Sequence, residues 1–450
     1  MRIGFVTLSG LRLVNAPLLE MGLSFPAISR RAAEIAALPN LGLLTLAGMT
    51  PRRIDVEYLE VPDANSFEAP SHFDAVAITA LSATAKESYQ LAAKFRAHGT
   101  QVIIGGLHAT LAPVDVKPHA DAVAIGEGEM VWPEILADLE RGTLKSVYDA
   151  RAKGFFDLRK APMPSFHLLD SARKPRFTVQ TQRGCPLSCE FCASSMRLSP
   201  FKTKPVSKVI AEISALRQRF PNAFIEFADD NTFVNRRHAR ELMKALRPLG
   251  VRWFAESDLS IAEDEELLKM MREAGCAQVL IGFESPDFAA LDGVELNSNW
   301  KARRAEQACR AVEKIQRQGI TVCGCFVMGL DGSGPECFNG VMRFVRDSGL
   351  YDVQITYLTP FPSTPLFHRL SEAGRLLAED STERCTLFDI NFEPSHMTRD
   401  QLEGGFQRLA ARLYKPEFVE QRKQRFFGHL KQRVLEDRHR RFNTANQLAS

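Results

Sequence analysis

The sequence predicts an α/β protein with two parallel sheets, a doubly wound (Rossmann-like) sheet followed by a partial (β/α)6 barrel, and a helical C-terminal extension. Two separate alternations of short apolar runs with amphipathic helices support this prediction. Continuous apolar strands between helices are typical of parallel sheets that are covered on both faces. The chain has 450 residues, 45% of them hydrophobic, and is long enough to bury both cores.

The first alternation covers residues 1–141. Its predicted strands are Arg2–Leu8, Ile54–Leu59, Ala75–Thr79, Gln101–Ile104 and Ala122–Ile125, and its predicted helices include Lys86–His98 and Trp132–Leu139. Residues 142–176 lose this period and contain several prolines, so we expect them to form a linker.

The second alternation covers residues 177–365. Its predicted strands are Phe177–Gln182, Ala223–Phe227, Val251–Ala255, Gln278–Gly282, Thr321–Met328 and Asp352–Tyr357. Helices are predicted between them, at Val206–Phe220, Arg237–Leu249, Asp264–Ala274, Lys301–Gln318 and Glu336–Gly349. Six such units fall short of the eight of a closed barrel. Residues 366–450 are expected to contain only helices, at Met397–Leu413 and Phe418–Arg441.

The composition excludes several classes of protein. The formal net charge of +3 is too small to indicate a nucleic-acid binder. No apolar run approaches the ~18 residues of a membrane-spanning helix, and no export signal is visible, so we expect a soluble, cytoplasmic protein. Residues 415–441 are basic, which favours a solvated helix face. Attachment of this helix to an anionic membrane surface, aided by Phe426 and Phe427, is the alternative.

Three cysteines follow the first strand of the second alternation. Cys185, Cys189 and Cys192 have the spacing C-x3-C-x2-C, and no further Cys or His follows before His238. Thiolates are soft ligands that suit zinc or iron–sulfur clusters. A structural zinc site is normally closed by a fourth ligand nearby. The motif therefore favours a 4Fe-4S cluster with one open iron over an incomplete zinc site or three buried cysteines.

This motif, placed after the first strand of a partial barrel, resembles that of the radical S-adenosylmethionine (SAM) enzymes. Phe191, directly before the last cysteine, matches the aromatic residue usual there. The resemblance implies that the amino and carboxylate groups of SAM chelate the open iron. An external electron donor reduces the cluster, and SAM is cleaved to methionine and a 5′-deoxyadenosyl radical, which abstracts a hydrogen atom.

The resemblance also implies SAM contacts at the ends of the barrel strands. Glu284 belongs to Gly-Phe-Glu-Ser, similar to the Gly-x-Glu-Ser of the family, although a strand-end cap is its alternative. Asp229 and Asp230 stand where many members carry Gly-Gly-Glu, and we weigh SAM ligand and helix N-cap equally for them. The full set of predicted SAM contacts is Phe191, Asp229, Asp230, Ser257, Glu284, Ser285 and Thr359.

The first sheet joined to this barrel resembles the cobalamin-binding branch of the same enzymes. Small and polar residues at its strand ends let a large ligand approach the backbone closely. The predicted cobalamin contacts are Ser82, Thr84, Gly105, Gly106, Gly126 and Glu127. The Asp-x-His-x-x-Gly that supplies an axial histidine in many cobalamin domains is absent, and His108 is expected to be a solvated loop residue. A sheet that has lost the corrinoid and only packs on the barrel is the alternative.

The second half of the barrel is most similar to the sub-branch of hopanoid methylases and related lipid-modifying enzymes, which implies a small, apolar substrate. Together these resemblances imply a cobalamin-dependent radical SAM methyltransferase that methylates an unactivated carbon through a 5′-deoxyadenosyl radical and methylcobalamin. One alternative is a cyclisation or rearrangement with the same cofactors. Another is a corrinoid-binding or electron-carrying module without turnover. No His–carboxylate pair indicates a general acid or base.

Overall fold

The computed structural model describes residues 1–10, 12–173, 175–192, 198–377 and 382–448. The chain forms two compact units. The first comprises residues 1–234, 294–297 and 357–393, and the second comprises residues 235–293, 298–356 and 394–450. The division at residues 141, 176 and 365 stays a prediction.

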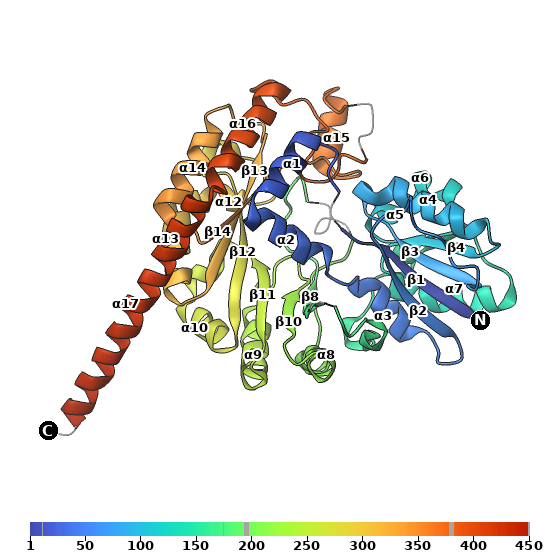
Figure 1. The fold of residues 1–450 in the computed structure, drawn as a ribbon, viewed down its shortest axis with the longest axis horizontal. Coiled ribbons are helices and arrows are strands. Elements are labelled where there is room, and N and C mark those ends of the chain that lie inside the picture. Colours follow the sequence, from blue (N-terminus) through green and yellow to red (C-terminus); the bar gives the residue numbers. More distant parts are fainter. Residues whose placement is uncertain (11, 174, 193–197, 378–381, 449–450) are drawn as a thin grey trace. The chain divides into compact units, whose positions relative to one another are not determined.

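The first unit begins with a six-stranded sheet in the order β2-β1-β3-β4-β5-β6. Figure 1 labels four of its strands, β1 to β4. Its strands are β1 (Arg2–Leu8), β2 (Asp55–Val61), β3 (Ala75–Thr79), β4 (Gln101–Gly105), β5 (Ala122–Ile125) and β6 (Val147–Asp149). All neighbouring strands are parallel. An interior first strand with later strands on both sides is typical of a doubly wound sheet, which binds ligands beyond the carboxyl ends of its strands.

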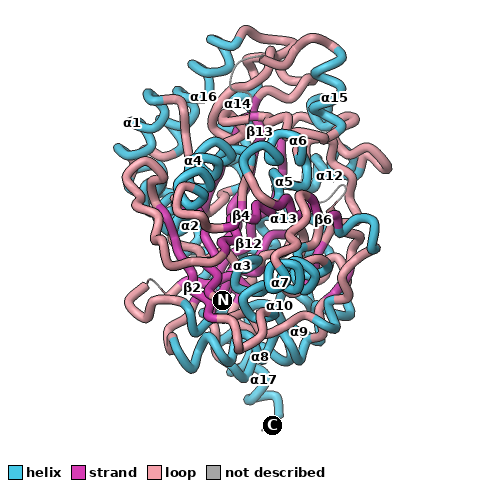
Figure 2. The backbone as a smooth tube through the Cα atoms, turned by 90° about the vertical axis from the view of Figure 1, so that its right-hand side faces the viewer, coloured by secondary structure: helices cyan, strands magenta, loops and turns pink. Residues whose placement is uncertain are grey.

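Helices cover both faces of this sheet and bury two apolar layers. On one face α3 (Leu41–Met49) and α7 (Trp132–Arg141) lie side by side (Figure 2). There Trp132 packs on Phe5, with ring centroids 5.4 Å apart. On the other face α4 (Ala85–Arg96) buries Leu91 and Phe95 against the sheet. The remaining helices of this region are α1 (Ala16–Ser24), α2 (Pro26–Ala36), α5 (Leu107–Leu111) and α6 (Pro113–Val116).

One stretch near the N-terminus, Arg31–Met49, is long and apolar enough by length and composition to cross a membrane, which the sequence analysis did not expect. In the structure it is divided between α2 and α3. The side chain of Asn40 caps α3 by accepting the backbone N–H of Leu43 at 2.9 Å. Leu43, Leu44 and Ala47 are buried, so this part of the stretch supplies core contacts within its own unit.

The second sheet has the strand order β14-β13-β12-β11-β10-β7, which follows the sequence as in the wall of a barrel. Its strands are β7 (Arg176–Val179), β10 (Phe224–Phe227), β11 (Arg252–Ser257), β12 (Cys276–Glu284), β13 (Thr321–Met328) and β14 (Asp352–Tyr357). The helices in this part of the chain are α8 (Val206–Arg219), α9 (Arg236–Leu246), α10 (Glu265–Glu273), α11 (Phe288–Leu291), α12 (Trp300–Arg304), α13 (Ala308–Arg317) and α14 (Cys337–Ser348). This arrangement matches the predicted partial (β/α)6 barrel.

Two local expectations are wrong. The first barrel strand ends at Val179 instead of Gln182, because the backbone N–H groups of Thr181 and Gln182 donate to the Asp229 carboxylate at 2.7 and 3.0 Å. The predicted linker contains an edge strand, β6, which pairs with β5. Three-residue strands have too little period to stand out in a sequence.

The C-terminal extension contains helices in its described part, and the described residues of 373–398 form turns and loops with an isolated bridge between Leu376 and Phe392. Its helices are α15 (Pro365–Glu372), α16 (Arg399–Leu413) and the 33-residue α17 (Pro416–Leu448). Phe426 is buried, with its ring 5.2 Å from that of Tyr351. It therefore supports packing inside its unit and is not available to a membrane, whereas Phe427 is exposed.

Candidate functional site

The three predicted cluster ligands lie on one loop of the first unit. The loop leaves β8 (Gln182–Arg183) and returns at β9 (Lys202–Thr203), and these two strands pair antiparallel. Cys189 is buried, and Cys185 and Cys192 are half-buried. The short hairpin β8–β9 therefore forms the stem of the cluster loop, the name used below for residues 184–201, of which residues 193–197 lie outside the described part.

Backbone hydrogen bonds hold the described part of the cluster loop at several points. The N–H of Glu190 donates to the carbonyl of Val294 at 2.9 Å, and the N–H of Leu366 donates to the carbonyl of Glu190 at 3.1 Å. The Glu190 carboxylate also pairs with Arg369 at 2.8 Å. Segments far apart in the sequence thus fix the backbone between Cys189 and Cys192.

Gly184, the residue before the first cysteine, has a conformation that requires glycine. Its φ is +80°, and a Cβ there would lie 2.6 Å from the carbonyl oxygen of Ser199. A side chain at this position would therefore both strain the backbone and separate the two strands of the stem. The Gly184 N–H donates to the carboxylate of Asp230 at 3.1 Å.

Asp229 and Asp230 accept hydrogen bonds from backbone N–H groups of another segment, and neither caps a helix. Asp229 is buried. Besides the N–H groups of Thr181 and Gln182, which follow β7, its carboxylate accepts the Thr181 hydroxyl at 2.5 Å. Burial raises the pKa of Asp229 to about 6, against the effect of these hydrogen bonds. The N-cap of α9 is Asn235, so the helix-cap interpretation of both aspartates is wrong. Their assignment as SAM contacts stays a prediction.

The donor set of the cluster loop fits a 4Fe-4S cluster. Three thiolates from one short segment suit iron–sulfur ligation and leave one iron for another ligand. Among the described residues, no three His, Cys, Asp or Glu side chains are grouped closely enough for a single metal ion.

A second group of predicted SAM contacts lies in the second unit, at the end of β12. Glu284 is buried and has a φ of +60°, an unusual conformation for a residue with a side chain. Its carboxylate pairs with Lys301 of α12 at 2.6 Å, and Lys301 also donates to the carbonyl of Gly282 at 3.0 Å. Ser285 is buried and accepts the N–H of Asp287, and Ser257 is buried at the end of β11. Glu284 is therefore a paired charge at a strained strand end.

Replacing Lys301 by methionine is expected to leave Glu284 as an unpaired buried charge. The two side chains are only 11% and 8% exposed, and breaking such a pair costs about 3–5 kcal/mol. We expect the free energy of unfolding to fall by this amount in denaturant titrations.

Two further variants separate this effect from a general loss of packing. Glu284→Gln added to Lys301→Met is expected to recover most of the lost stability. Arg317→Met, which removes an exposed i,i+4 pair with Glu313, is expected to cost less than about 1 kcal/mol. Equal losses in Lys301→Met and Arg317→Met would contradict a buried, energetically important pair.

The two remaining predicted SAM contacts lie in the first unit. Phe191 is half-buried on the cluster loop. Thr359 is buried two residues after β14, and its hydroxyl donates to the carbonyl of Tyr357 at 3.2 Å.

A cavity of about 360 Å³ lies at the carboxyl ends of β3, β4 and β5 in the first unit. Four of the predicted cobalamin contacts line it: Gly105, Gly106, Gly126 and Glu127. Its floor is apolar, formed by residues of the sheet, α3 and α7 such as Ala77, Leu43 and Trp132. Its polar wall includes Asp230 and the first residues of the cluster loop and its stem.

Gly105 and Gly106 let the chain turn out of β4 at the edge of this cavity. Gly106 has φ +95° and ψ −167°, a region open only to glycine. A Cβ on Gly106 would lie 2.6 Å from the Thr79 hydroxyl and 3.0 Å from the Ala80 carbonyl. The cavity therefore depends on the close approach of two strand ends that only glycine allows.

Ser82 and Thr84 do not line this cavity. The Thr84 hydroxyl accepts the N–H of Leu81 at 3.2 Å, and the buried Ser82 hydroxyl lies 3.3 Å from Nδ1 of His108. The expectation of a solvated His108 is wrong: its ring is buried, and its Nε2 lies 3.0 Å from the Tyr89 hydroxyl. Burial lowers the pKa of His108, so the ring is a neutral part of the core beside β3.

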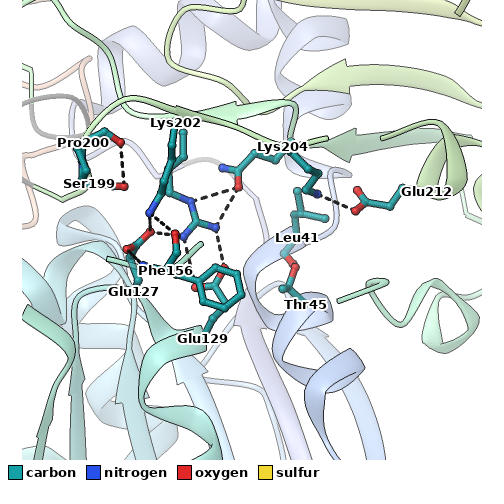
Figure 3. A network of polar contacts seen from close by, with 12 residues as sticks. Leu41, Thr45, Glu127, Glu129, Phe156, Ser199, Pro200, Lys202, Lys204 and Glu212 are labelled. Carbon is teal, nitrogen blue, oxygen red and sulfur yellow. Dashed lines mark hydrogen bonds and ion pairs between the residues drawn. The ribbon is translucent and has the colours of Figure 1, made fainter. Parts of the chain in front are cut away.

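Glu127, predicted as a cobalamin contact, is the centre of a charged network (Figure 3). Its carboxylate pairs with Arg183 of β8 and with Lys202 of β9, each at 2.6 Å, and accepts the N–H of Phe156 at 2.7 Å. Burial acts to raise the pKa of Glu127, but the hydrogen bonds from Lys202, Phe156 and Arg183 outweigh it and hold that pKa below its usual value. Glu129 pairs with the other arm of Arg183 at 2.6 Å.

Arg183, Lys202 and Lys301 were not predicted as site residues. Each is a basic residue without a local motif, and its partner lies 17 to 75 residues away along the chain. The one signal available was a charged residue two positions before the first cysteine, which is Arg183.

The comparisons with known proteins agree with this architecture. Residues 179–345 match the model of the radical SAM superfamily, and residues 364–450 match a domain of unknown function. Bacteriochlorophyllide d C-12(1)-methyltransferase of Chlorobaculum tepidum is 27% identical, over 85% of this chain and 84% of the relative. Hopanoid C-2 methylase of Rhodopseudomonas palustris is 26% identical, over 85% and 73%. An anaerobic magnesium-protoporphyrin IX monomethyl ester cyclase of Rubrivivax gelatinosus is 25% identical, over 67% and 58%.

The fold is shared with solved structures of the same kind. The cobalamin-dependent SAM radical enzyme OxsB, solved with aqua-cobalamin and SAM bound, superposes with a TM-score of 0.67 at 14% identity, covering 90% of this chain and 65% of that one. The predicted fold class and the predicted resemblance are both confirmed. The chain is therefore an enzyme that carries a radical SAM domain, within the fold of the cobalamin-dependent radical SAM enzymes.

Proposed function

We propose that this protein is a cobalamin-dependent radical SAM methyltransferase that methylates an unactivated carbon of a small, apolar molecule. One observation carries the proposal: a single unit places a three-cysteine loop in the wall of a glycine-rimmed cavity at the carboxyl edge of a doubly wound sheet. When bound, a 4Fe-4S cluster, SAM and cobalamin supply the radical and the methyl group.

The chain's own residues bind and orient these groups. Cys185, Cys189 and Cys192 hold the cluster, and the hydrogen bonds from Glu190 and Gly184 fix the backbone that carries them. Cys185 and Cys192 are half-buried, so neither thiol is fully enclosed by the described residues. Phe191, Asp229, Asp230, Ser257, Glu284, Ser285 and Thr359 stay the proposed SAM contacts.

The cavity fits part of a corrinoid. Its volume is at the lower end of ligand pockets, about 300–1,000 Å³, and its floor is apolar. Its floor would accept an apolar part of the ligand. Gly105, Gly106 and Gly126 would let the backbone approach this ligand, and Glu127, which lines the same cavity, stays a proposed contact.

The substrate class rests on the relatives named above, which by name act on hopanoids and bacteriochlorophyllides. We propose a small, apolar substrate, an external electron donor and no nucleic-acid partner. A reduced iron–sulfur cluster is best maintained in a reducing compartment, so we place the enzyme in the cytoplasm. The cyclase among the relatives supports a second candidate function, a non-methylating radical reaction with the same cofactors.

The cofactor content tests this proposal. After anaerobic purification, cluster reconstitution and incubation with cobalamin, we expect about four irons and one cobalt per chain, with a corrin absorption band. Iron without cobalt would retain the radical SAM domain and refute the cobalamin-dependent function. A protein that bound neither iron nor cobalt would refute both the iron–sulfur cluster and the cobalamin-dependent function.

A further inference from the structure

The four charged residues Glu127, Glu129, Arg183 and Lys202 join two parts of the first unit that are distant in sequence. Figure 3 labels Glu127, Glu129 and Lys202 of this network. The two glutamates lie in the connection between β5 and α7, and three of the four residues, all but Lys202, line the cavity. Arg183 and Lys202 pair with each other across the two strands of the stem, at the end that joins the cluster loop. Both strands of the stem are thus tied to one carboxylate, that of Glu127, at the cavity rim.

The geometry of this network is restrictive. Arg183 uses separate nitrogens for Glu127 and Glu129, both at 2.6 Å, and the same guanidinium donates to Gln180 at 3.0 and 3.2 Å. A planar guanidinium with several partners fixes direction as well as distance. Lys202 donates to Glu127 and to the carbonyl of Phe156 at 2.7 Å. Two cations and two anions balance, so the network needs no further ion.

The network is also shielded from water. The side chains of Glu127 and Glu129 are 6% and 9% exposed, and those of Arg183 and Lys202 are 22% and 17% exposed. Charge pairs in such a position are screened far less than surface pairs. A shift of the rim segment 126–129 would therefore move both strands of the stem, and Arg183 is only two residues from Cys185.

We infer that Arg183 is a positioning residue that couples occupancy of the cavity to the geometry of the cluster loop. This inference rests on the proposed function for the identity of the two ligands, a corrinoid and an iron–sulfur cluster. Coupling between two sites is reciprocal, so a ligand in the cavity favours the same arrangement of the stem that the cluster favours. The structure gives this coupling a defined route through Arg183, Glu127 and Lys202.

The test compares corrinoid affinity with and without the cluster. Hydroxocobalamin is titrated into the full-length protein before and after anaerobic reconstitution, and the dissociation constants are obtained from the absorbance change. We expect the cluster to tighten binding in the natural protein, within the 5- to 150-fold range typical of coupled sites. In Arg183→Gln the ratio is expected to fall to about one, and Arg183→Lys, which keeps one ion pair, is expected to be intermediate.

Two further readouts separate positioning from a general structural role. The g values of the reduced cluster, resolved from the signal of the cob(II)alamin that the reductant forms, are expected to shift on corrinoid addition in the natural protein and to stay unchanged in Arg183→Gln. Arg159→Gln, which removes an exposed pair with Asp157 outside the network, is expected to behave as the natural protein. The inference would be overturned if a folded, cluster-containing Arg183→Gln kept the affinity ratio of the natural protein. It would also be overturned if that ratio were one in the natural protein. Absence of any corrinoid binding in the natural protein would instead refute the proposed function.

Discussion

Cys189→Ala is expected to lose its iron and to form 5′-deoxyadenosine from SAM at a rate indistinguishable from a protein-free control. Cys189 is one of only three thiolates in the loop, and two thiolates cannot hold a four-iron cluster with a defined open site. The expected loss is at least about a thousandfold, because no cleavage proceeds without the electron that the cluster delivers. Iron analysis, the visible spectrum and chromatography of the nucleoside product measure it.

Cys309→Ala provides the matched control. Cys309 is an exposed cysteine on α13, in the other unit, and its loss should leave iron content and SAM cleavage unchanged. If Cys189→Ala kept its iron and cleaved SAM, or if Cys309→Ala lost both, the assignment of the cluster to the loop at 185–192 would be wrong.

Gly106→Ala is expected to weaken cobalamin binding by at least about tenfold while the iron content stays unchanged. The methyl group would force a backbone region that only glycine occupies, at a cost of about 1–3 kcal/mol. It would also push Thr79 and Ala80 away from β4 at the mouth of the cavity. Absorbance titration with hydroxocobalamin and iron analysis separate the two effects.

Gly154→Ala is the control for this backbone strain. Gly154 has φ +88° and ψ −146°, close to the values at Gly106, but a Cβ there meets nothing within 4 Å. It should lose a similar amount of stability and keep its cobalamin affinity. Equal affinities in Gly106→Ala and the natural protein would show that the cavity at the strand ends is not the corrinoid site.

The strands were predictable where they are buried on both faces. β1, β3, β5, β13 and β14 match the predicted ranges. Nearly continuous apolar runs such as β3 and β5 have few other structures open to them, whereas β14 alternates polar and apolar residues. The single helix predicted at Lys301–Gln318 is instead divided into α12 and α13. Helix boundaries of this kind depend on tertiary packing, which local propensity does not encode.

The cluster motif was readable because its three ligands are close in sequence, whereas the interactions around it were not. Arg183 and Glu127 are 56 residues apart, and Asp229 and Thr181 are 48 residues apart. No period or motif connects such pairs. His108 shows the same limit: a histidine after a Gly-Gly turn gives no sign in the sequence that Tyr89 and Ser82 enclose it.

The central claim is methyl transfer, and the two nucleoside products of SAM test it most directly. The reconstituted, cobalamin-loaded protein is incubated anaerobically with SAM and a reductant, and 5′-deoxyadenosine and S-adenosylhomocysteine are quantified by mass spectrometry. We predict both products, with S-adenosylhomocysteine formed only when cobalamin is bound and lost in Gly106→Ala. Formation of 5′-deoxyadenosine without S-adenosylhomocysteine, in protein shown to hold cobalamin, would contradict the methyltransferase and favour a non-methylating radical reaction.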